Sequence, residues 1–386
     1  MSTVEKSRLK LGIVPLADCA PLVAAKERGF FAEQGLEVEL SREASWANIR
    51  DKVALGALDG AQMLATMPLS MTLGLAAIQE PVVAVAALNL GGNTITLSAG
   101  LAARMDSLTP AALKAVLDED RAAGLPPMAF AMVYPFSTHH LELRCWLASG
   151  GIDPDCDVRL VVVPPPQMVA HLSAGNIAGF CVGEPWGSLA AKLGLGRIAA
   201  TSNDVFAGRI DKVLGVTRAF ADVHPETVSR LVKAVINAAR WCDHNPAELA
   251  TLLAQPAYLN VPADVVRQGL TLLTFHRHAA NFPWRSQAVW FLRQMQRWNL
   301  APQSVDARRA AEEAYRPDLY RLAALELGLP VPLTDYKTEG HHAAPWVLDK
   351  ATAPIEMGPD LMLDGALFDP IALPEAAPLG LKETTP

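Results

Sequence analysis

The sequence predicts an α/β fold of two lobes arranged as a clamshell, each lobe a mostly parallel β-sheet flanked by helices. Three observations lead to this expectation. Strand-like and helix-like segments alternate from the N-terminus, which is typical of sheets with helical crossovers. The alternation resumes after the segment GGNTITLSAG, residues 91–100, and a long helical stretch follows from about residue 225. A ligand cleft between the lobes, near strand ends and helix starts, is therefore expected.

The first lobe is expected to begin with a buried strand and to alternate strands with helices. Strands are predicted at 9–16, 36–43, 61–66 and 82–90, and helices at 19–35 and 46–60. Gly35 is expected to end the first helix and Gly60 the second, because glycine favours the position after a helix.

The second lobe repeats this pattern. Helices are predicted at 109–124, 139–151 and 165–179, and strands at 127–135, 157–164 and 180–186. Proline occupies the first turn of the third helix, where its missing N–H is tolerated. A strand-like run at 212–220 precedes the helical stretch, and from about residue 329 the chain is irregular and rich in proline and glycine.

Composition argues against several classes of protein. The 386 residues are 51% hydrophobic and 19% charged, which is enough apolar content to bury one large core or two moderate ones. The net charge is −7 and no basic cluster occurs, which argues against direct binding to nucleic acid or to an anionic membrane. The five cysteines are irregularly spaced without a CxxC pair, so neither a disulfide framework nor a zinc site is indicated.

The N-terminal segment does not have the features of an export signal. Its apolar run LGIVPL is short, contains Pro15 and is typical of a buried strand, and no lipobox cysteine or membrane-length apolar stretch occurs. A cytoplasmic protein is expected, unless a leader has been removed from the chain.

Two helix starts are the first candidates for a ligand site. Ser45 is a good N-cap for the helix beginning at Trp46. Ser137 or Thr138 can cap the helix beginning at His139. Free N–H groups and the positive end of a helix favour an anion at both starts. Trp46 and His139 would then flank the anion, and the alternatives are an edge-packing tryptophan and a surface or capping histidine.

Ionisable residues extend this group of candidates. His139 at a helix N-terminus is expected to be neutral and to present one N–H donor, and the sequence alone does not rank it against His140. Lys212 lies where a polar loop enters an apolar strand, so it is either the cation that a desolvated monoanion requires or a solvated loop lysine. Glu184, in the segment GEPW, is expected to serve as a cap or an inter-lobe contact.

Patterns for catalysis or metal binding are scarce. Walker A, GxGxxG, HExxH and GxSxG sequences do not occur. His341 and His342 could form half of a metal site, but nothing supplies the other ligands, and solvated histidines are the better interpretation. Binding without a cofactor or a metal is therefore a better interpretation than catalysis.

Several blocks of the sequence resemble the nitrate-binding proteins of the NrtA type. They are SWANIRDK at 45–52, PPPQM at 164–168, GEPW at 183–186, DKVLGV at 211–216, and the late segments MGPD and DGALFDP. The resemblance extends over nearly the whole chain. It implies the type II periplasmic-binding-protein fold, in which the chain crosses between lobes twice, with lobe I formed by 1–93 and 215–386 and lobe II by 94–214.

The resemblance also implies four ligand-binding residues. In the family a tryptophan, a glutamine, a histidine and a lysine hold the anion; the matches here are Trp46, Asn93 (a departure from the glutamine), His139 and Lys212. Bicarbonate-binding relatives carry an acidic residue in place of the lysine. Nitrate accepts hydrogen bonds and carries no proton, so the retained lysine predicts a site of donors and one cation for nitrate or nitrite.

Members of this family without an export signal resemble NasS, a cytoplasmic nitrate/nitrite sensor of assimilation operons. Such sensors hold an RNA-binding antiterminator of the ANTAR class, NasT, inactive until nitrate binds. The resemblance implies a sensor with an ANTAR-type partner and no direct contact with nucleic acid. One alternative is the substrate-binding component of an ABC nitrate transporter whose leader has been removed. Another is a pyrimidine-precursor synthase-like enzyme, although the cysteine-rich motif of that family is absent.

Overall fold

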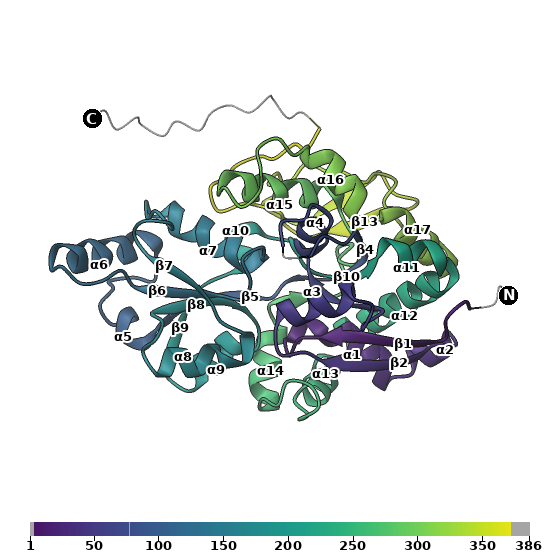
Figure 1. Ribbon diagram of the computed structural model, residues 1–386, viewed down its shortest axis with the longest axis horizontal. Helices are drawn as coiled ribbons and strands as arrows, with labels where there is room; N and C mark the ends of the chain where they lie inside the picture. The colour runs from purple at the N-terminus through teal and green to yellow at the C-terminus, as the bar shows by residue number, and fades with distance from the viewer. Residues whose placement is uncertain (1–3, 77, 372–386) are drawn as a thin grey trace.

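The computed structural model describes residues 4–76 and 78–371. These residues form two lobes side by side, each built around its own β-sheet with helices packed against it (Figure 1). The two-lobe α/β architecture predicted from the alternation of strands and helices is confirmed.

The first sheet has six strands in the order β11-β4-β10-β3-β1-β2. Their bounds are β1 (Arg8–Ile13), β2 (Glu37–Arg42), β3 (Gly60–Leu64), β4 (Val82–Gly91), β10 (Ile210–Thr217) and β11 (Leu273–Thr274). The second sheet has five strands in the order β7-β6-β8-β5-β9. Their bounds are β5 (Asn93–Ser98), β6 (Ala129–Met132), β7 (Arg159–Val162), β8 (Gly179–Gly183) and β9 (Gly196–Thr201).

Four strands of each sheet run in the same direction, in agreement with the predicted mostly parallel sheets, and the strand that arrives from the other lobe runs against its neighbours. β10 enters the first sheet and pairs antiparallel with β3 and β4. β5 enters the second sheet and pairs antiparallel with β8 and β9. The first residues of each arriving strand therefore lie beside the last residues of its neighbours, at the sheet edge where α/β proteins collect binding groups.

The chain crosses between the sheets twice. The first crossing is at Gly91 and Gly92, whose φ angles of +67° and +95° favour glycine. The second lies between α10 (Ser202–Phe206) and β10. The predicted lobe boundary between residues 214 and 215 is wrong, because it falls inside β10, all of which belongs to the first sheet. The charged pair Asp211–Lys212 made the start of this strand resemble a loop. Asn93, assigned to the first lobe, begins β5 of the second.

Helices surround both sheets. Those of the first lobe are α1 (Ala20–Glu27), α2 (Phe30–Glu33), α3 (Trp46–Ala54), α4 (Met67–Thr72), α11 (Arg218–Val223), α12 (Pro225–His244), α13 (Pro246–Leu253), α14 (Ala263–Leu270), α15 (Arg285–Arg297), α16 (Ala307–Ala314) and α17 (Pro317–Glu326), with the 3₁₀ turn η1 (Ala17–Cys19). Those of the second are α5 (Ala99–Ala102), α6 (Pro110–Ala122), α7 (Thr138–Ser149), α8 (Met168–Ser173), α9 (Trp186–Lys192) and α10, with the 3₁₀ turn η2 (Pro165–Gln167).

Two predicted helices are shorter in the structure because glycines end them early. The helix expected at 19–35 is divided into α1 and α2 by Gly29, whose φ is +80°. The helix expected to end at Gly60 stops before Gly56, whose φ is +70°, and Gly60 instead begins β3. A positive φ interrupts helical geometry, so the first glycine able to adopt it ends the helix.

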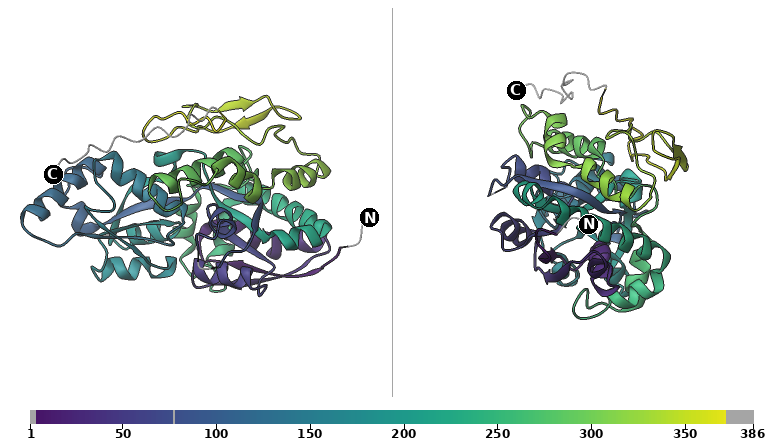
Figure 2. Two further views of the ribbon diagram at one scale, coloured as in Figure 1. Left: turned by 45° about the horizontal axis from the view of Figure 1, so that its top comes forward. Right: turned by 90° about the vertical axis from the view of Figure 1, so that its right-hand side faces the viewer.

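The C-terminal part of the described chain is mostly irregular, as predicted, and contains one short hairpin, β12 (Trp346–Leu348) with β13 (Ile355–Met357). It lies over one face of the molecule (Figure 2). Beyond the hairpin it runs along the second crossing. There the N–H of Ala207 donates to the carbonyl of Leu361, and the N–H of Leu363 donates to the carbonyl of Val205, both at 2.9 Å. Within residues 4–76 and 78–371, no helix is both long and apolar enough to cross a bilayer.

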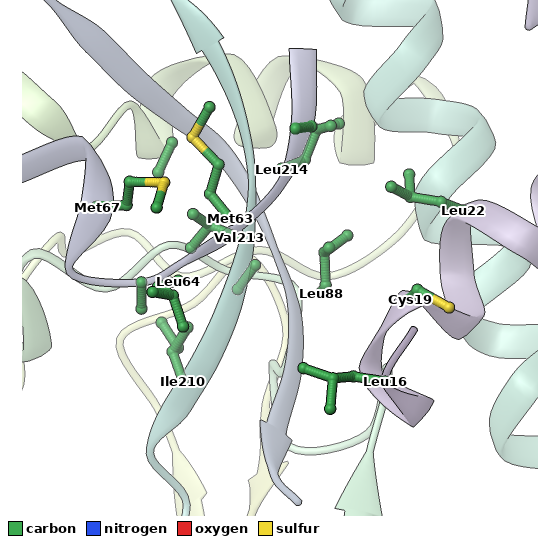
Figure 3. Packing of buried hydrophobic residues seen from close by; sticks show 14 of the residues in the cluster. Leu16, Cys19, Leu22, Met63, Leu64, Met67, Leu88, Ile210, Val213 and Leu214 are labelled. Atoms are coloured by element: carbon green, nitrogen blue, oxygen red, sulfur yellow. The ribbon is translucent and has the colours of Figure 1, made fainter. Parts of the chain in front are cut away.

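The centre of the first lobe is a packed apolar core. Figure 3 shows side chains of β3, β4 and β10 meeting others from the segment around η1, among them Met63, Leu88, Val213, Leu214, Leu16 and Leu22, all buried. Close packing of this kind resists displacement. It therefore provides a rigid support for the polar residues that lie between these strands and the second lobe.

Candidate functional site

The first sequence candidate, Trp46, opens α3 and is fully buried. Ser45 caps this helix as predicted, since its Oγ accepts the N–H of Asn48 at 3.3 Å. The indole Nε1 of Trp46 has no hydrogen-bond partner among the described residues. A buried donor without a partner is unfavourable and uncommon in native proteins. Trp46 is thus not a tryptophan packed at a surface edge, and its N–H is available to a ligand.

The second candidate, His139, lies in the first turn of α7 in the other lobe. Ser137 caps this helix, its Oγ accepting the N–H of His140 at 3.0 Å. The His139 side chain is fully buried, and neither of its ring nitrogens has a partner within the described part of the chain. A neutral imidazole in this position offers one donor and one acceptor.

The structure separates His139 from its neighbour. In His140, Nδ1 lies 2.6 Å from the carbonyl of Pro135, and Nε2 accepts from the guanidinium of Arg144 at 2.7 Å. Both of its nitrogens are therefore used within the second lobe. Only His139 of the two has nitrogens left for a ligand.

Lys212 is not a solvated loop lysine, because it lies inside β10 and is fully buried. Its Nζ lies 5.6 Å from the centre of the Trp46 ring, within the range of a cation–π contact. The prediction of a site containing only donors and one cation is wrong. The ammonium forms an ion pair with Asp18 at 3.1 Å and a second with Asp211. These carboxylates come from η1 and from β10 itself.

A bulge explains how two consecutive residues of one strand meet. Side chains of neighbouring strand residues normally point to opposite faces of the sheet. The pairing of β10 with β4 shifts register on both sides of Lys212, between Ile210 and Lys212 and between Lys212 and Val213. Such irregularities redirect side chains and are common beside functional sites. Here the irregularity allows Asp211 to contact the ammonium of Lys212.

Asp211 connects the residues predicted from different segments. Its carboxylate accepts hydrogen bonds from the amide of Asn93, at 2.8 Å, and from the hydroxyl of Thr138, beside His139. The amide of Asn93 also donates to Glu142 at 2.9 Å, and its Oδ1 has no partner among the described residues. Asn93, His139 and Lys212 therefore lie around Asp211 between the two lobes, and Trp46 joins the group through its contact with Lys212.

Five residues of this cluster were not predicted from the sequence: Asp18, Gln62, Glu142, Arg209 and Asp211. The Gln62 amide donates to Asp18 and accepts the N–H of Val14 at 2.7 Å. The Arg209 guanidinium pairs with Glu142 and lies 3.5 Å from Asp211. The charged run RIDK at 209–212, directly before an apolar strand, is a signal that could have identified two of them.

Burial determines the electrostatics of the site. Desolvation and the nearby ammonium of Lys212 hold the pKa of His139 well below its ordinary value, so the imidazole is neutral, as predicted from its position in the helix. Burial raises the pKa of Asp18 to about 6 against the opposing effect of Lys212. Burial also acts to raise the pKa of Asp211, but Lys212 and Arg209 outweigh it and keep this pKa below its usual range.

Contacts between the lobes enclose the cluster. The N–H of Ala17 donates to the carbonyl of Glu184 at 2.7 Å, and the indole of Trp186 donates to the carbonyl of Pro15 at 3.1 Å. The carboxylate of Glu184 accepts the N–H of Ser188 at 3.2 Å in α9. Glu184 thus has both roles expected of it, as a helix cap and as an inter-lobe contact.

The other sequence candidates lie away from the cluster. His342 stacks on Trp346 at 4.0 Å and its Nδ1 lies 3.1 Å from Asp360, while His341 is exposed. The five cysteines are free thiols. In the part of the chain that the structure describes, no group of three or more His, Cys, Asp or Glu side chains has a geometry suited to a metal ion.

The comparisons with known proteins agree with this fold. A model of the NMT1-like family matches residues 2–255, more than half of the chain. The chain belongs to this family. Within it, the chain is 33% identical to the nitrate/nitrite binding protein NrtA of Synechococcus elongatus over 406 aligned positions, covering 98% of the chain and 87% of that relative. The resemblance to NrtA-type proteins is therefore confirmed.

Further relatives are longer than this chain. The nitrate import ATP-binding protein NrtC and the bicarbonate transport ATP-binding protein CmpC of Synechocystis are 41% and 40% identical, each over 85% of the chain. The chain spans about half of these relatives, 51% of each. The crystal structure of the periplasmic nitrate-binding protein NrtA from Synechocystis superimposes with a TM-score of 0.85 at 29% identity, covering 96% of this chain and 97% of that one. The clamshell fold is thereby confirmed.

Proposed function

We propose that the protein binds nitrate or nitrite between its two lobes, and that the bound anion controls an ANTAR-type RNA-binding antiterminator in the cytoplasm. The observation that carries the binding proposal is the set of buried, unpartnered ring nitrogens of Trp46 and His139 beside the ammonium of Lys212. Trp46 and Lys212 belong to the first lobe and His139 belongs to the second. An anion held by all three residues would therefore favour the closed arrangement of the lobes.

The chemistry of these groups supports a small planar oxyanion. Nitrate has three oxygens that accept hydrogen bonds, and the indole N–H, the imidazole N–H and the ammonium are all donors. Charge-assisted bonds of this kind are short and strong. The names of the NrtA relatives and of NrtC support the same ligand.

Bicarbonate is the most informative competitor. CmpC is nearly as similar to this chain as NrtC, and the carboxylates beside Lys212 offer acceptors that a bicarbonate hydroxyl could use. Retention of the lysine supports nitrate, because a lysine adds a donor where an acidic residue would add an acceptor.

Binding rather than catalysis is proposed, without a cofactor. The unpartnered nitrogens of Trp46 and His139 lie in the same buried cluster as the ammonium of Lys212, an arrangement that stabilises a bound anion and supplies no nucleophile. The fold alone does not decide between the two, since one fold hosts many functions.

Calorimetric titration of the purified protein tests the binding proposal. Nitrate and nitrite are expected to bind saturably at one site per chain, and bicarbonate is expected to bind more weakly. Tighter binding of bicarbonate than of nitrate would reverse the assignment, and an absence of heat and of any fluorescence change with all three anions would refute it.

The sensor proposal depends on coupling between binding and lobe closure. An anion that prefers the closed form lowers the affinity of a partner that prefers the open form by the same factor. A coupling free energy of about 1–3 kcal/mol is sufficient for a switch of 5- to 150-fold.

Co-purification separates sensing from transport. The sensor proposal expects an ANTAR-domain protein encoded beside this chain to bind it without nitrate and to dissociate when nitrate is added. The second candidate is the binding component of an ABC nitrate transporter, which the periplasmic NrtA structure favours. Finding the chain produced from its own gene in an extracytoplasmic compartment, with no nitrate-sensitive complex, would support transport and contradict sensing.

A further inference from the structure

The charges at the centre of the site do not balance. Two cations contact three carboxylates, and each of these side chains is at most 2% exposed: Lys212, Arg209, Asp18, Asp211 and Glu142. With every group ionised, this cluster carries one net negative charge. A monoanion bound beside the ammonium adds a second, and uncompensated buried charge is strongly unfavourable.

Of the three carboxylates, Asp18 accepts the fewest hydrogen bonds. Asp211 accepts two hydrogen bonds from neutral side chains in addition to its ion pairs. Glu142 accepts from a guanidinium and from an amide. Asp18 accepts one amide hydrogen bond, from Gln62, while its Oδ2 has no hydrogen-bond partner and lies 3.1 Å from the Nζ of Lys212. An anion that pairs with the ammonium of Lys212 in place of Asp18 therefore removes the main stabilisation of the ionised Asp18.

Among the described residues, the second lobe approaches Asp18 through the backbone at Gly183 and places no cation beside it. A Cβ on Gly183, at the end of β8, would lie 3.1 Å from Oδ2 of Asp18. From α7, the imidazole of His139 lies within electrostatic reach of Lys212 and Asp211, and it is neutral. The closed lobes thus bring no positive charge that would keep Asp18 ionised once the ammonium is shared.

The remaining surroundings of η1 include a cation, Arg42 of β2, which acts on the thiol of Cys19, whereas Lys212 is the cation that acts on Asp18. Cys19, on the same turn, has its pKa raised by burial and by Asp18, so the thiol is uncharged. β4 contains no ionisable residue. The charged groups of α1 and α14 are exposed at the surface: Lys26, Glu27, Asp264 and Arg267. Among the described residues, Lys212 is therefore the cation on which the charge of Asp18 depends.

We propose that Asp18 takes up one proton from solvent for each nitrate that binds, an inference that rests on the proposed function of the site. The proton balances the charge of the arriving anion, so the net charge of the cluster does not change. It also changes the role of Asp18. The neutral carboxyl no longer competes for the ammonium of Lys212, and it presents an O–H donor to the anion in place of a charged acceptor. Burial has already raised the pKa of the free Asp18 to about 6, so its pKa starts closer to neutral pH than that of an ordinary aspartate.

Titration calorimetry at about pH 7.5 in two buffers of different ionisation enthalpy, phosphate and Tris, counts the protons taken up with nitrate. About one proton per nitrate is expected in the wild type. The nitrate Kd is expected to rise by up to about tenfold per pH unit above the pKa of the free Asp18. In Asp18→Asn, proton uptake and the pH dependence of Kd should both disappear.

Glu184→Gln is the matched control, because burial raises the pKa of Glu184 to about 7 and, in the part of the chain that the structure describes, its carboxylate caps α9 and makes no contact with Lys212. Uptake should persist in this variant. Nitrate binding without proton uptake in the wild type overturns the inference and leaves the proposed function standing, as does uptake that persists in Asp18→Asn. Failure of the wild type to bind nitrate at any pH refutes the proposed function instead. Should Asp18→Asn not fold, the infrared difference spectrum of the wild type decides: nitrate must produce the C=O band of a protonated carboxyl.

Discussion

Replacing Lys212 with methionine removes a charge and keeps a long apolar stem, so it tests the ammonium with little change in packing. The ammonium of Lys212 has two carboxylate partners, Asp18 at 3.1 Å and Asp211, and all three side chains are buried. Removing one member of a buried ion pair leaves the other uncompensated, and this costs about 3–5 kcal/mol. The free energy of unfolding of a domain is about 5–15 kcal/mol, so a large part of the stability is at risk.

The same change removes the countercharge of the bound anion. We expect nitrate affinity to fall by about 2–4 kcal/mol, roughly 30- to 700-fold in Kd. Urea unfolding and titration calorimetry measure the two effects separately. Lys192→Met is the matched control, because its ammonium pairs with Asp264 at the surface, where such pairs contribute at most about 1 kcal/mol.

Combining the change with Asp18→Asn separates stability from binding. The double variant should recover part of the lost stability, about 1–3 kcal/mol, because one uncompensated carboxylate is gone. It should not recover affinity, since the cation is still absent. A folded Lys212→Met protein that binds nitrate within threefold of the wild type would refute the placement of the anion beside this lysine.

Three further predictions follow from the same contacts. Trp46→Phe keeps the buried ring and removes the N–H donor, so nitrate affinity should fall by about 1.5–3 kcal/mol by calorimetry, and any fluorescence response to nitrate should diminish. His139→Ala should reduce affinity about tenfold or more with a smaller effect on thermal stability, whereas His140→Ala should do the opposite; equal effects of both changes on affinity would contradict the distinction between them. Hydrogen bonds from Thr227 and its neighbouring backbone outweigh burial and lower the pKa of Glu5 to about 2, so the stabilisation of α12 by Glu5 is present above its unfolded pKa of about 4.3 and disappears as the pH falls towards 2. Glu5→Gln should lower the urea midpoint at neutral pH and leave it unchanged in strong acid.

The predictable part of the site depends on local signals. Serine before a helix is a cap because it accepts a nearby backbone N–H, and Ser45 and Ser137 act in this way. Each cap defines where a helix begins, which is why Trp46 and His139 could be located from the sequence. The alternation of strands and helices is equally local, and it predicted both lobes.

The parts that could not be predicted depend on contacts between distant segments. Asp18 and Lys212 are 194 positions apart in the sequence and meet because η1 follows the end of β1, and β10 begins at the same edge of the first sheet. The choice between His139 and His140 required knowledge of which ring already has partners, and those partners are set by tertiary packing. The bulge at the start of β10 has no distinct sequence pattern, so the meeting of Asp211 with its neighbour was not foreseen.

The full burial of Trp46, His139 and Lys212 has a consequence for timing. An anion enclosed by both lobes can exchange with solvent only while the lobes are apart, so its dwell time is set by how often they separate as well as by how tightly it is held. Changes in anion concentration that are faster than the opening and closing of the lobes are averaged. A partner that recognises the closed form therefore responds to the time-averaged anion concentration.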